Sequence, residues 1–190
     1  MKEKLRILLV DPSEKWVTNN SNLKYYEQVM VPIGLMALSA FLKQKFPNEI
    51  ETKIISTIVD LDGIEQINEV LDEFSPQIVG IRAVAFYNEI VNALADICKE
   101  KDPNILLLAG GPDISIENNL LLDNKNIDLF MEGEGEEVFS EIVGYYINTG
   151  VAGLLKHVKN IKVYWKKRKN FMKKNWITKK TFTMKKNRIC

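Results

Sequence analysis

The 190 residues suffice for one α/β domain with a hydrophobic core and an appendage, and 46% hydrophobic with 27% charged residues is ordinary for a globular protein. No apolar run reaches the ~20 residues that a membrane helix needs, and the N-terminus lacks a signal-peptide pattern, so we expect a cytoplasmic protein without a membrane partner. The two cysteines, Cys98 and Cys190, form neither a disulfide framework nor a CxxC site, and we expect Cys98 to be a buried thiol.

The net charge of +1 conceals an abrupt change along the chain. Residues 1–150 contain 12 Lys and Arg against 25 Asp and Glu, whereas residues 151–190 contain 14 Lys and Arg and no acid. Such a shift marks a boundary. We therefore predict a domain in residues 1–150 and a basic tail in residues 151–190.

Short apolar or β-branched runs alternate with helical patterns along the predicted domain. Strands are predicted at 4–10, 51–60, 76–85, 104–113 and 127–133. Helices are predicted at 32–46, 63–74, 88–101 and 136–150, with a weak one around 116–122. The first helix begins near Pro32 and repeats apolar residues at helical spacing, namely Ile33, Met36, Ala37, Ala40 and Phe41.

This alternation predicts an α/β fold, Rossmann-like or flavodoxin-like, with a doubly wound five-stranded parallel sheet. We expect the strand order 2-1-3-4-5. Ligands of such sheets bind beyond the carboxyl ends of the strands, near the point where the winding reverses. The loops that follow the strands are therefore the places to search for a site.

Two adjacent glycines, Gly110 and Gly111, follow the fourth predicted strand. Residues without Cβ atoms let the backbone take positive φ and let a flat ligand approach the main chain, although a simple tight turn uses them too. The chain has no GxGxxG after its first strand and no GxxxxGK[ST], so a dinucleotide or nucleoside triphosphate site has no support.

The segment 132–137 after the fifth strand contains four carboxylates and two glycines. It has no EF-hand spacing and no nearby histidine, so we predict no metal ligands there. We expect the glutamates to interact with the N-terminus of the following helix, and Gly133 and Gly135 to form a turn on which a ligand can rest. The single histidine, His157, lies in the tail, so we predict no catalytic triad or dyad.

Five segments taken together carry a family resemblance. They are ILLVDP, VPIGLMALSAFLK, PQIVGI, ILLLAGGPDIS and IDLFMEGEGEEVFSEI. In this order and spacing they closely resemble the N-terminal cobalamin-binding domain of cobalamin-dependent radical S-adenosylmethionine (SAM) enzymes, over Leu5 to about Gly150. The resemblance implies a Rossmann-like domain that holds the corrin ring over the C-terminal ends of the strands, with the nucleotide tail beside the sheet.

The resemblance also implies which positions bind the cofactor. They are Pro32, Ile33, Gly34, Arg82, Ala83, Val84, Ala85, Phe86, Gly110, Gly111, Pro112, Glu132, Gly133, Glu134 and Gly135. A corrin needs a broad apolar shelf and close backbone approach more than it needs charges, and these loops offer both.

Three departures from related cobalamin proteins matter. Cobalamin mutases carry DxHxxG after the first strand, and here that region has no histidine, which implies cobalamin bound without a histidine ligand from this domain. The Ser-x-Leu of those mutases corresponds to Arg82-x-Val84, which implies altered contacts to the nucleotide tail. Asp113 stands where many relatives have a histidine after GGP.

The radical SAM domain itself is missing from this sequence. Its CxxxCxxC motif binds a [4Fe–4S] cluster, and Cys98 and Cys190 cannot supply those three thiolates, so we expect no iron–sulfur cluster in this chain. We expect a corrinoid-binding fragment or split part of a radical SAM enzyme, such as a methyltransferase. It would not be catalytic alone, and a radical SAM domain would be its partner in trans.

Two other functions stay open. Asp11, Asp60 and Asp113 near strand ends are reminiscent of a flavodoxin-like or receiver-like signalling module, although the acceptor pattern of receivers is missing. The tail interleaves lysines with aromatic residues, as a nucleic-acid-binding arm does, or it is a solvated basic extension. We favour a third interpretation, that the tail follows a truncation and is an out-of-frame or degraded linker, so nucleic acid is not the expected partner.

Overall fold

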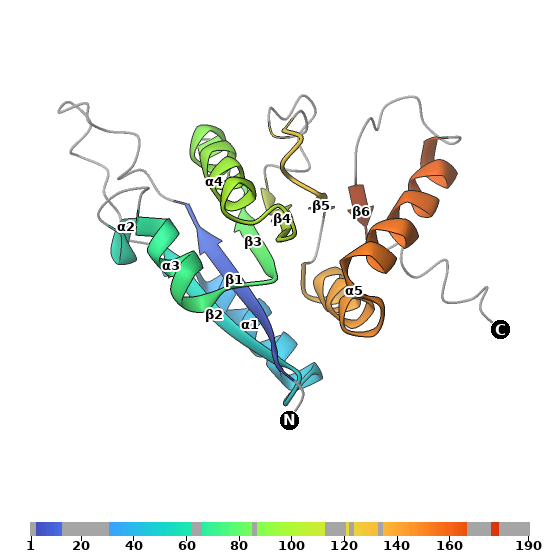
Figure 1. Ribbon diagram of the computed structural model, residues 1–190, viewed down its shortest axis with the longest axis horizontal. Coiled ribbons are helices and arrows are strands. Elements are labelled where there is room, and N and C mark those ends of the chain that lie inside the picture. Colours follow the sequence, from blue (N-terminus) through green and yellow to red (C-terminus); the bar gives the residue numbers. More distant parts are fainter. Residues whose placement is uncertain are drawn as a thin grey trace.

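The computed structural model describes residues 3–12, 31–61, 66–84, 87–112, 121, 124–132, 135–166 and 176–178 (Figure 1). The strands are β1 (Leu5–Asp11), β2 (Ile50–Ser56), β3 (Ile78–Arg82), β4 (Leu106–Gly110), β5 (Leu129–Glu132) and β6 (Trp176–Thr178). The helices are α1 (Ile33–Lys45), α2 (Thr57–Asp60), α3 (Gln66–Phe74), α4 (Asn88–Lys101) and α5 (Gly135–Lys166). The weak helix predicted at 116–122 lies outside the described residues, except for Leu121.

The strands form one parallel sheet in the order β2-β1-β3-β4-β5-β6. The predicted α/β fold and the order 2-1-3-4-5 are therefore confirmed. The sixth strand was not predicted. It comes from the basic tail and pairs with β5 at the sheet edge, with Phe130 opposite Trp176.

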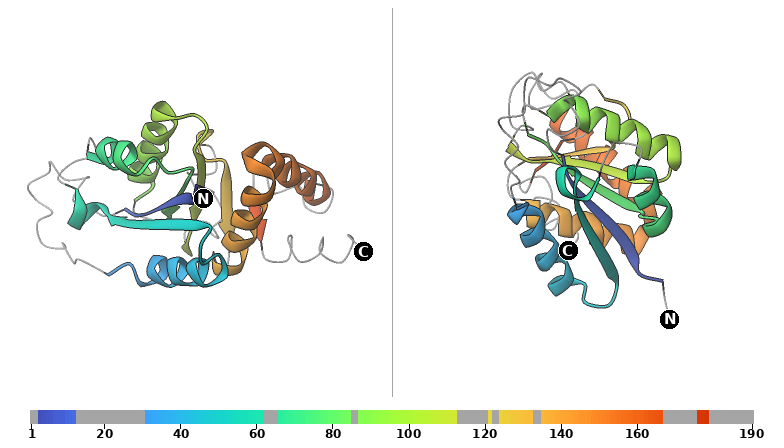
Figure 2. Two further views of the ribbon diagram at one scale, coloured as in Figure 1. Left: turned by 60° about the horizontal axis from the view of Figure 1, so that its bottom comes forward. Right: turned by 90° about the vertical axis from the view of Figure 1, so that its left-hand side faces the viewer.

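Helices cover both faces of the sheet (Figure 2). On one face Leu9, Leu108 and their neighbours pack with α1 and α5, and on the other Leu8, Val79 and theirs pack with α3 and α4. Burial on both faces explains why the strands read as continuous apolar runs. Each helix layer thus borders one face of the carboxyl edge, where a ligand is expected.

The buried side of α1 differs from the predicted apolar repeat. Its buried residues are Leu35, Leu38, Ser39 and Leu42. From the predicted repeat, Ile33 is 73% exposed and Met36 is 51% exposed. The repeat predicted the helix correctly, but α1 carries apolar residues around most of its circumference, so helical spacing alone could not select the side that packs on the sheet.

Two element boundaries also differ from the prediction. The strand predicted at 51–60 ends at Ser56, where the backbone N–H donates to Asp60 Oδ2 at 2.6 Å and the short helix α2 begins. The helix predicted to end at Gly150 continues as a second helical segment after a kink, where Gly150 has φ 67° and ψ −179°. Beyond the kink, Leu154 is fully buried in the core. The boundary at residue 150 nevertheless stays a prediction.

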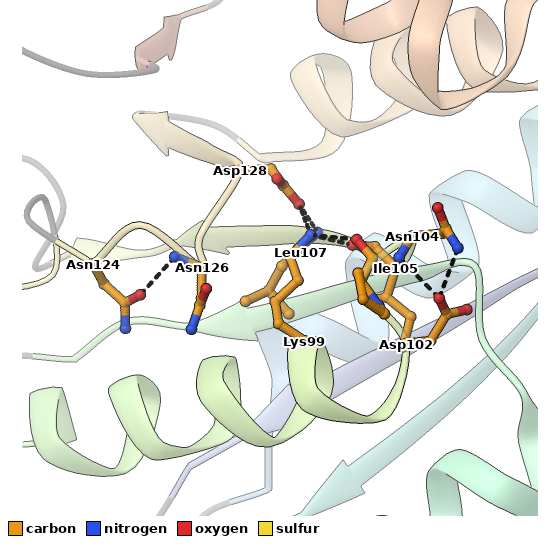
Figure 3. Close-up of polar contacts among 9 residues, drawn as sticks. Lys99, Asp102, Asn104, Ile105, Leu107, Asn124, Asn126 and Asp128 are labelled. Carbon is orange, nitrogen blue, oxygen red and sulfur yellow. Dashed lines mark hydrogen bonds and ion pairs between the residues drawn. The ribbon is translucent and has the colours of Figure 1, made fainter.

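A polar cluster fixes the crossover into β5 at the amino edge of the sheet (Figure 3). Lys99 Nζ donates to Ile105 O at 2.6 Å and to Asp128 Oδ2 at 2.7 Å. The same carboxylate oxygen accepts the backbone N–H of Leu107 at 2.8 Å. Both charged side chains are mostly buried, and burial of an unpaired charge would lower the free energy of unfolding, so the ion pair is needed here.

Cys98 is buried on α4, as predicted. Burial raises the pKa of its thiol to about 12, and the neighbouring charge of Lys99 offsets this rise only in part. The thiol is therefore neutral and structural. Within the described residues, every helix is too short or too polar to cross a lipid bilayer.

Candidate functional site

The last side chains on the α1 and α5 face form a row across the carboxyl edge of the sheet. The strand register places Ser56, Asp11, Arg82, Gly110 and Met131 beside one another in that order. The winding of the sheet reverses between β1 and β3, which is the preferred ligand position in doubly wound sheets. Polar side chains therefore occupy this row at the ends of β2, β1 and β3. At the end of β4 the row has a glycine and no side chain.

A groove of about 230 Å³ opens on this row between the first turns of α1 and α5. We call it the carboxyl-edge groove. It is lined by Leu9, Gly34, Leu35, Leu38, Gly80, Ile81, Arg82, Gly110, Gly111, Pro112, Met131, Gly135, Glu136 and Phe139. Its volume is below the ~300 Å³ of pockets that enclose a whole drug-sized ligand, so it fits one part of a larger molecule.

Glycines bring the main chain to the wall of the groove. Gly111 has φ +139°, and a Cβ built there would lie 2.5 Å from the carbonyl oxygen of Ala83, so the position requires glycine. The turn is fixed because Ala83 N donates to Gly110 O at 2.8 Å. At Gly34 and Gly135 an added Cβ would meet no atom within 4 Å, so these two positions border open space.

Arg82 and Asp11 form an ion pair at the point where the winding reverses. Arg82 Nη1 donates to Asp11 Oδ1 at 2.7 Å. The Asp11 side chain is only 6% exposed, whereas the Arg82 side chain is 33% exposed. The buried carboxylate thus holds a guanidinium whose other side faces the groove.

The structure brings several predicted cofactor-binding positions together in this groove. They are Gly34, Arg82, Gly110, Gly111, Pro112 and Gly135. Pro32 and Ile33 lie at the start of α1 outside the groove lining, and Ala83 is buried in the core on the other face of the sheet. Val84, which follows Ala83 in the chain, is half-buried. Ala85, Phe86, Gly133 and Glu134 lie outside the described residues, and of Glu132 only the backbone at the end of β5 is described.

Other lining residues were missed by sequence reasoning. A glycine inside a strand signals a close approach, and Gly80 in β3 gave that signal. Its added Cβ would lie 3.0 Å from Leu9 and 3.6 Å from Phe139, so these side chains limit the depth of the groove. Leu35 and Leu38 were missed because the apolar spacing of α1 did not single out the side that packs on the sheet.

The glutamates after β5 behave as predicted where they are described. Glu136 and Glu137 lie in the first turn of α5, where carboxylates interact favourably with the free N–H groups of the helix. The described residues contain no group of three or more side chains suited to hold a metal ion. The side chains of the basic tail from residue 157 onward lie outside the described residues.

Comparison with known proteins relates the chain to one named protein and to one family. A Pyrococcus horikoshii protein named an uncharacterized methyltransferase is 28% identical over 140 residues, which are 73% of this chain but 29% of that relative. The chain thus spans less than a third of the relative's length. The B12 binding domain family matches residues 22–143, more than half of the chain. The chain therefore belongs to the B12-binding domain family.

Proposed function

We propose that the chain binds cobalamin at the carboxyl edge of its sheet, with part of the cofactor in the carboxyl-edge groove. Membership of the B12-binding domain family supports cobalamin as the ligand. The observation that carries the position is the convergence of Gly34, Arg82, Gly110, Gly111 and Gly135 from four separate elements on one groove. Only Gly110 and Gly111 are neighbours in sequence, so it is the fold that brings these residues together.

The residues present fit a corrinoid. The open space beside Gly34 and Gly135 and the glycine turn at Gly110 and Gly111 permit close approach of a ligand to the main chain. Ile33 and Met36 expose apolar side chains at the start of α1, which borders the same edge. An exposed apolar patch of this kind suits the flat face of a corrin ring.

The chain's own contribution to chemistry is binding and orientation. Bound cobalamin would supply cobalt-centred group-transfer chemistry. The only histidine is His157 in the tail, so we propose that residues 1–150 bind the cofactor without offering a histidine to cobalt. The groove, its glycine turn and the Arg82–Asp11 pair would fix the position of the cofactor relative to the sheet.

We further propose that the chain is the cofactor-binding part of a methyl-transferring radical SAM enzyme. The relative named as a methyltransferase supports methyl transfer, although the chain covers 29% of it. The chain's two cysteines cannot hold a [4Fe–4S] cluster, so a radical SAM domain elsewhere would supply it. On this proposal the isolated chain binds the cofactor and does not catalyse.

The test is a titration of the full chain with hydroxocobalamin, followed by its visible spectrum. We expect saturable binding at micromolar concentrations with a shifted spectrum. Gly34→Leu puts a side chain into the open side of the groove and is expected to weaken binding about tenfold, which corresponds to ~1.4 kcal/mol. The control is Gly144→Ala on α5, whose added Cβ makes an ordinary 3.6 Å contact with Phe46.

Absence of any saturable spectral change with the folded wild-type chain would refute the proposal. Equal binding by wild type and Gly34→Leu would place the cofactor elsewhere on the domain. Circular dichroism of each variant shows whether the fold is retained.

A further inference from the structure

Arg82 is the one basic residue among the described residues that line the carboxyl-edge groove, and Glu136 is the one acidic residue there. The remaining lining residues are apolar or glycine, apart from the polar ends of the backbone. A single cation, with one carboxylate beside it and apolar or glycine residues elsewhere on the wall, marks the place where an anionic group of the ligand can be recognised.

The guanidinium is held so that it can make further bonds. Within the described part of the chain, the guanidinium has Asp11 as its only hydrogen-bond partner, through Nη1. A guanidinium carries several N–H donors in a fixed plane, so the others stay available on its exposed side. The Asp11 carboxylate is buried, so it restrains the arginine without itself being offered to the ligand.

The groove changes from polar to apolar with depth. Leu9 and Gly80 occupy the row of the sheet directly below Arg82, two residues earlier on their strands. Leu38 and Phe139 lie further along α1 and α5 than the glycines at the mouth. This arrangement suits a flat neutral group at depth that is joined to an anion near the row of Arg82.

We propose that Arg82, positioned by Asp11, is the specificity-determining residue that binds the phosphodiester of the cofactor's nucleotide loop. This inference rests on the proposed function. Arginine makes short, charge-assisted hydrogen bonds to phosphate oxygens, often two at once. The chain therefore selects corrinoids that carry a nucleotide loop over cobinamide, which has the same corrin ring but lacks the phosphodiester.

The experiment measures the affinity of the full chain for hydroxocobalamin and for diaquacobinamide by spectral titration. Wild type is expected to bind hydroxocobalamin at least about tenfold more tightly than diaquacobinamide, the range of a hydrogen bond to a charged group. Arg82→Met is expected to remove this difference by weakening only hydroxocobalamin. The hydroxocobalamin affinity of wild type should also fall more steeply with NaCl than that of Arg82→Met.

Arg6→Met is the matched control, because Arg6 has a side-chain exposure of 29% and lies on the same strand as Asp11, at the opposite edge of the sheet. It should leave both affinities unchanged. Arg82→Met leaves the buried Asp11 carboxylate unpaired, which can impair folding. The double variant Asp11→Asn with Arg82→Met removes both charges, and it should show the same loss of discrimination in a folded protein.

The outcomes separate the two proposals. If wild type binds neither corrinoid, the proposed function fails. If wild type binds both and the substitutions at Arg82 change both affinities equally or neither, only the role of Arg82 is refuted. If millimolar inorganic phosphate competes with diaquacobinamide as strongly as with hydroxocobalamin, Arg82 is a general anion site and the inference is again refuted.

Discussion

The two edges of the sheet differ in what completes them. At the amino edge, side chains satisfy strand backbone groups, as Asp128 does for Leu107 N at 2.8 Å and Gln77 Oε1 for Arg6 N at 2.7 Å. At the carboxyl edge the polar side chains at the ends of β2, β1 and β3 give way to glycine at β4, and Gly34 and Gly135 face open space. The first edge is closed by the protein itself, and the second leaves its main chain accessible.

This difference assigns stability and ligand binding to separate places. Backbone donors that the chain satisfies internally cannot recognise a ligand, and removal of their partners costs free energy of folding. A glycine wall gives little packing energy but allows close approach. Substitutions at the amino edge should therefore lower stability alone, and most substitutions at the carboxyl edge should alter cofactor affinity.

The largest expected effect is at Gly111, where the two roles meet. Gly111→Ala would place a Cβ 2.5 Å from the Ala83 carbonyl oxygen at a φ of +139°, so we expect the free energy of unfolding to fall by about 3 kcal/mol. Urea denaturation measures it. Gly34→Ala is the control, because its Cβ meets no protein atom and alanine favours the helix by ~0.5–1 kcal/mol. Equal stability of the two variants would contradict the strained turn.

At the amino edge, Lys99→Met should be nearly as costly. It removes the charged partner of a mostly buried Asp128 and the donor to Ile105 O, so we expect a loss of about 2–3 kcal/mol in unfolding free energy. Cofactor affinity should not change. Lys101→Met breaks an exposed ion pair with Asp72 and should cost less than about 0.5 kcal/mol. If Lys99→Met lowers the cofactor affinity, the two edges do not have separate roles in stability and ligand binding.

The neighbouring Cys98 gives a pH-dependent effect of intermediate size. Its folded pKa is raised from 9.0 to about 12, so the unfolded chain ionises first as the pH rises above 9. The unfolding free energy should then fall by about 1.4 kcal/mol per pH unit between these values, on top of what other groups contribute. In Cys98→Ala, the unfolding free energy should fall less steeply with pH, because the variant has no thiol to ionise. Denaturation of both proteins at about pH 8.5 and about pH 10.5 compares the slopes, and parallel slopes would refute the raised pKa.

Much of the fold followed from local pattern. Short apolar or β-branched runs predicted β1 to β5, and the helix predicted at residues 88–101 is α4 with the same bounds. These features depend only on residues that are close together in the sequence. The turn at Gly110 and Gly111 was predictable for the same reason. The side of α1 did not follow, since two apolar sides compete and only the sheet decides between them.

The carboxyl-edge groove was predicted only in part, because its key pair is not local. Arg82 and Asp11 lie 71 residues apart in sequence and meet only when β1 and β3 pair as parallel strands. The resemblance to cobalamin-binding domains predicted Arg82 as a cofactor-binding residue. It did not predict that Asp11 forms an ion pair with Arg82. β6 shows the same limit, because three residues of a lysine-rich tail become a strand only through the free edge of β5.

The smallest expected effect concerns the charge that opposes Arg82 in the groove. Glu136→Gln removes the acidic side chain from the lining, so an anionic ligand should bind more tightly, by less than about fivefold because the carboxylate is partly exposed and screened. The same change removes a favourable interaction with the N-terminus of α5 and should lower stability by ~0.3–1 kcal/mol. Tighter hydroxocobalamin binding in a less stable protein is therefore expected.

Glu137→Gln separates these two contributions. Glu137 lies in the same first turn but does not line the groove, so its substitution should lower stability to a similar degree without tightening binding. If both variants tighten binding equally, the field of the whole helix terminus, and not a local contact in the groove, acts on the ligand. The carboxyl edge would then recognise charge at long range, and the division of roles between the two edges would rest on the glycines alone.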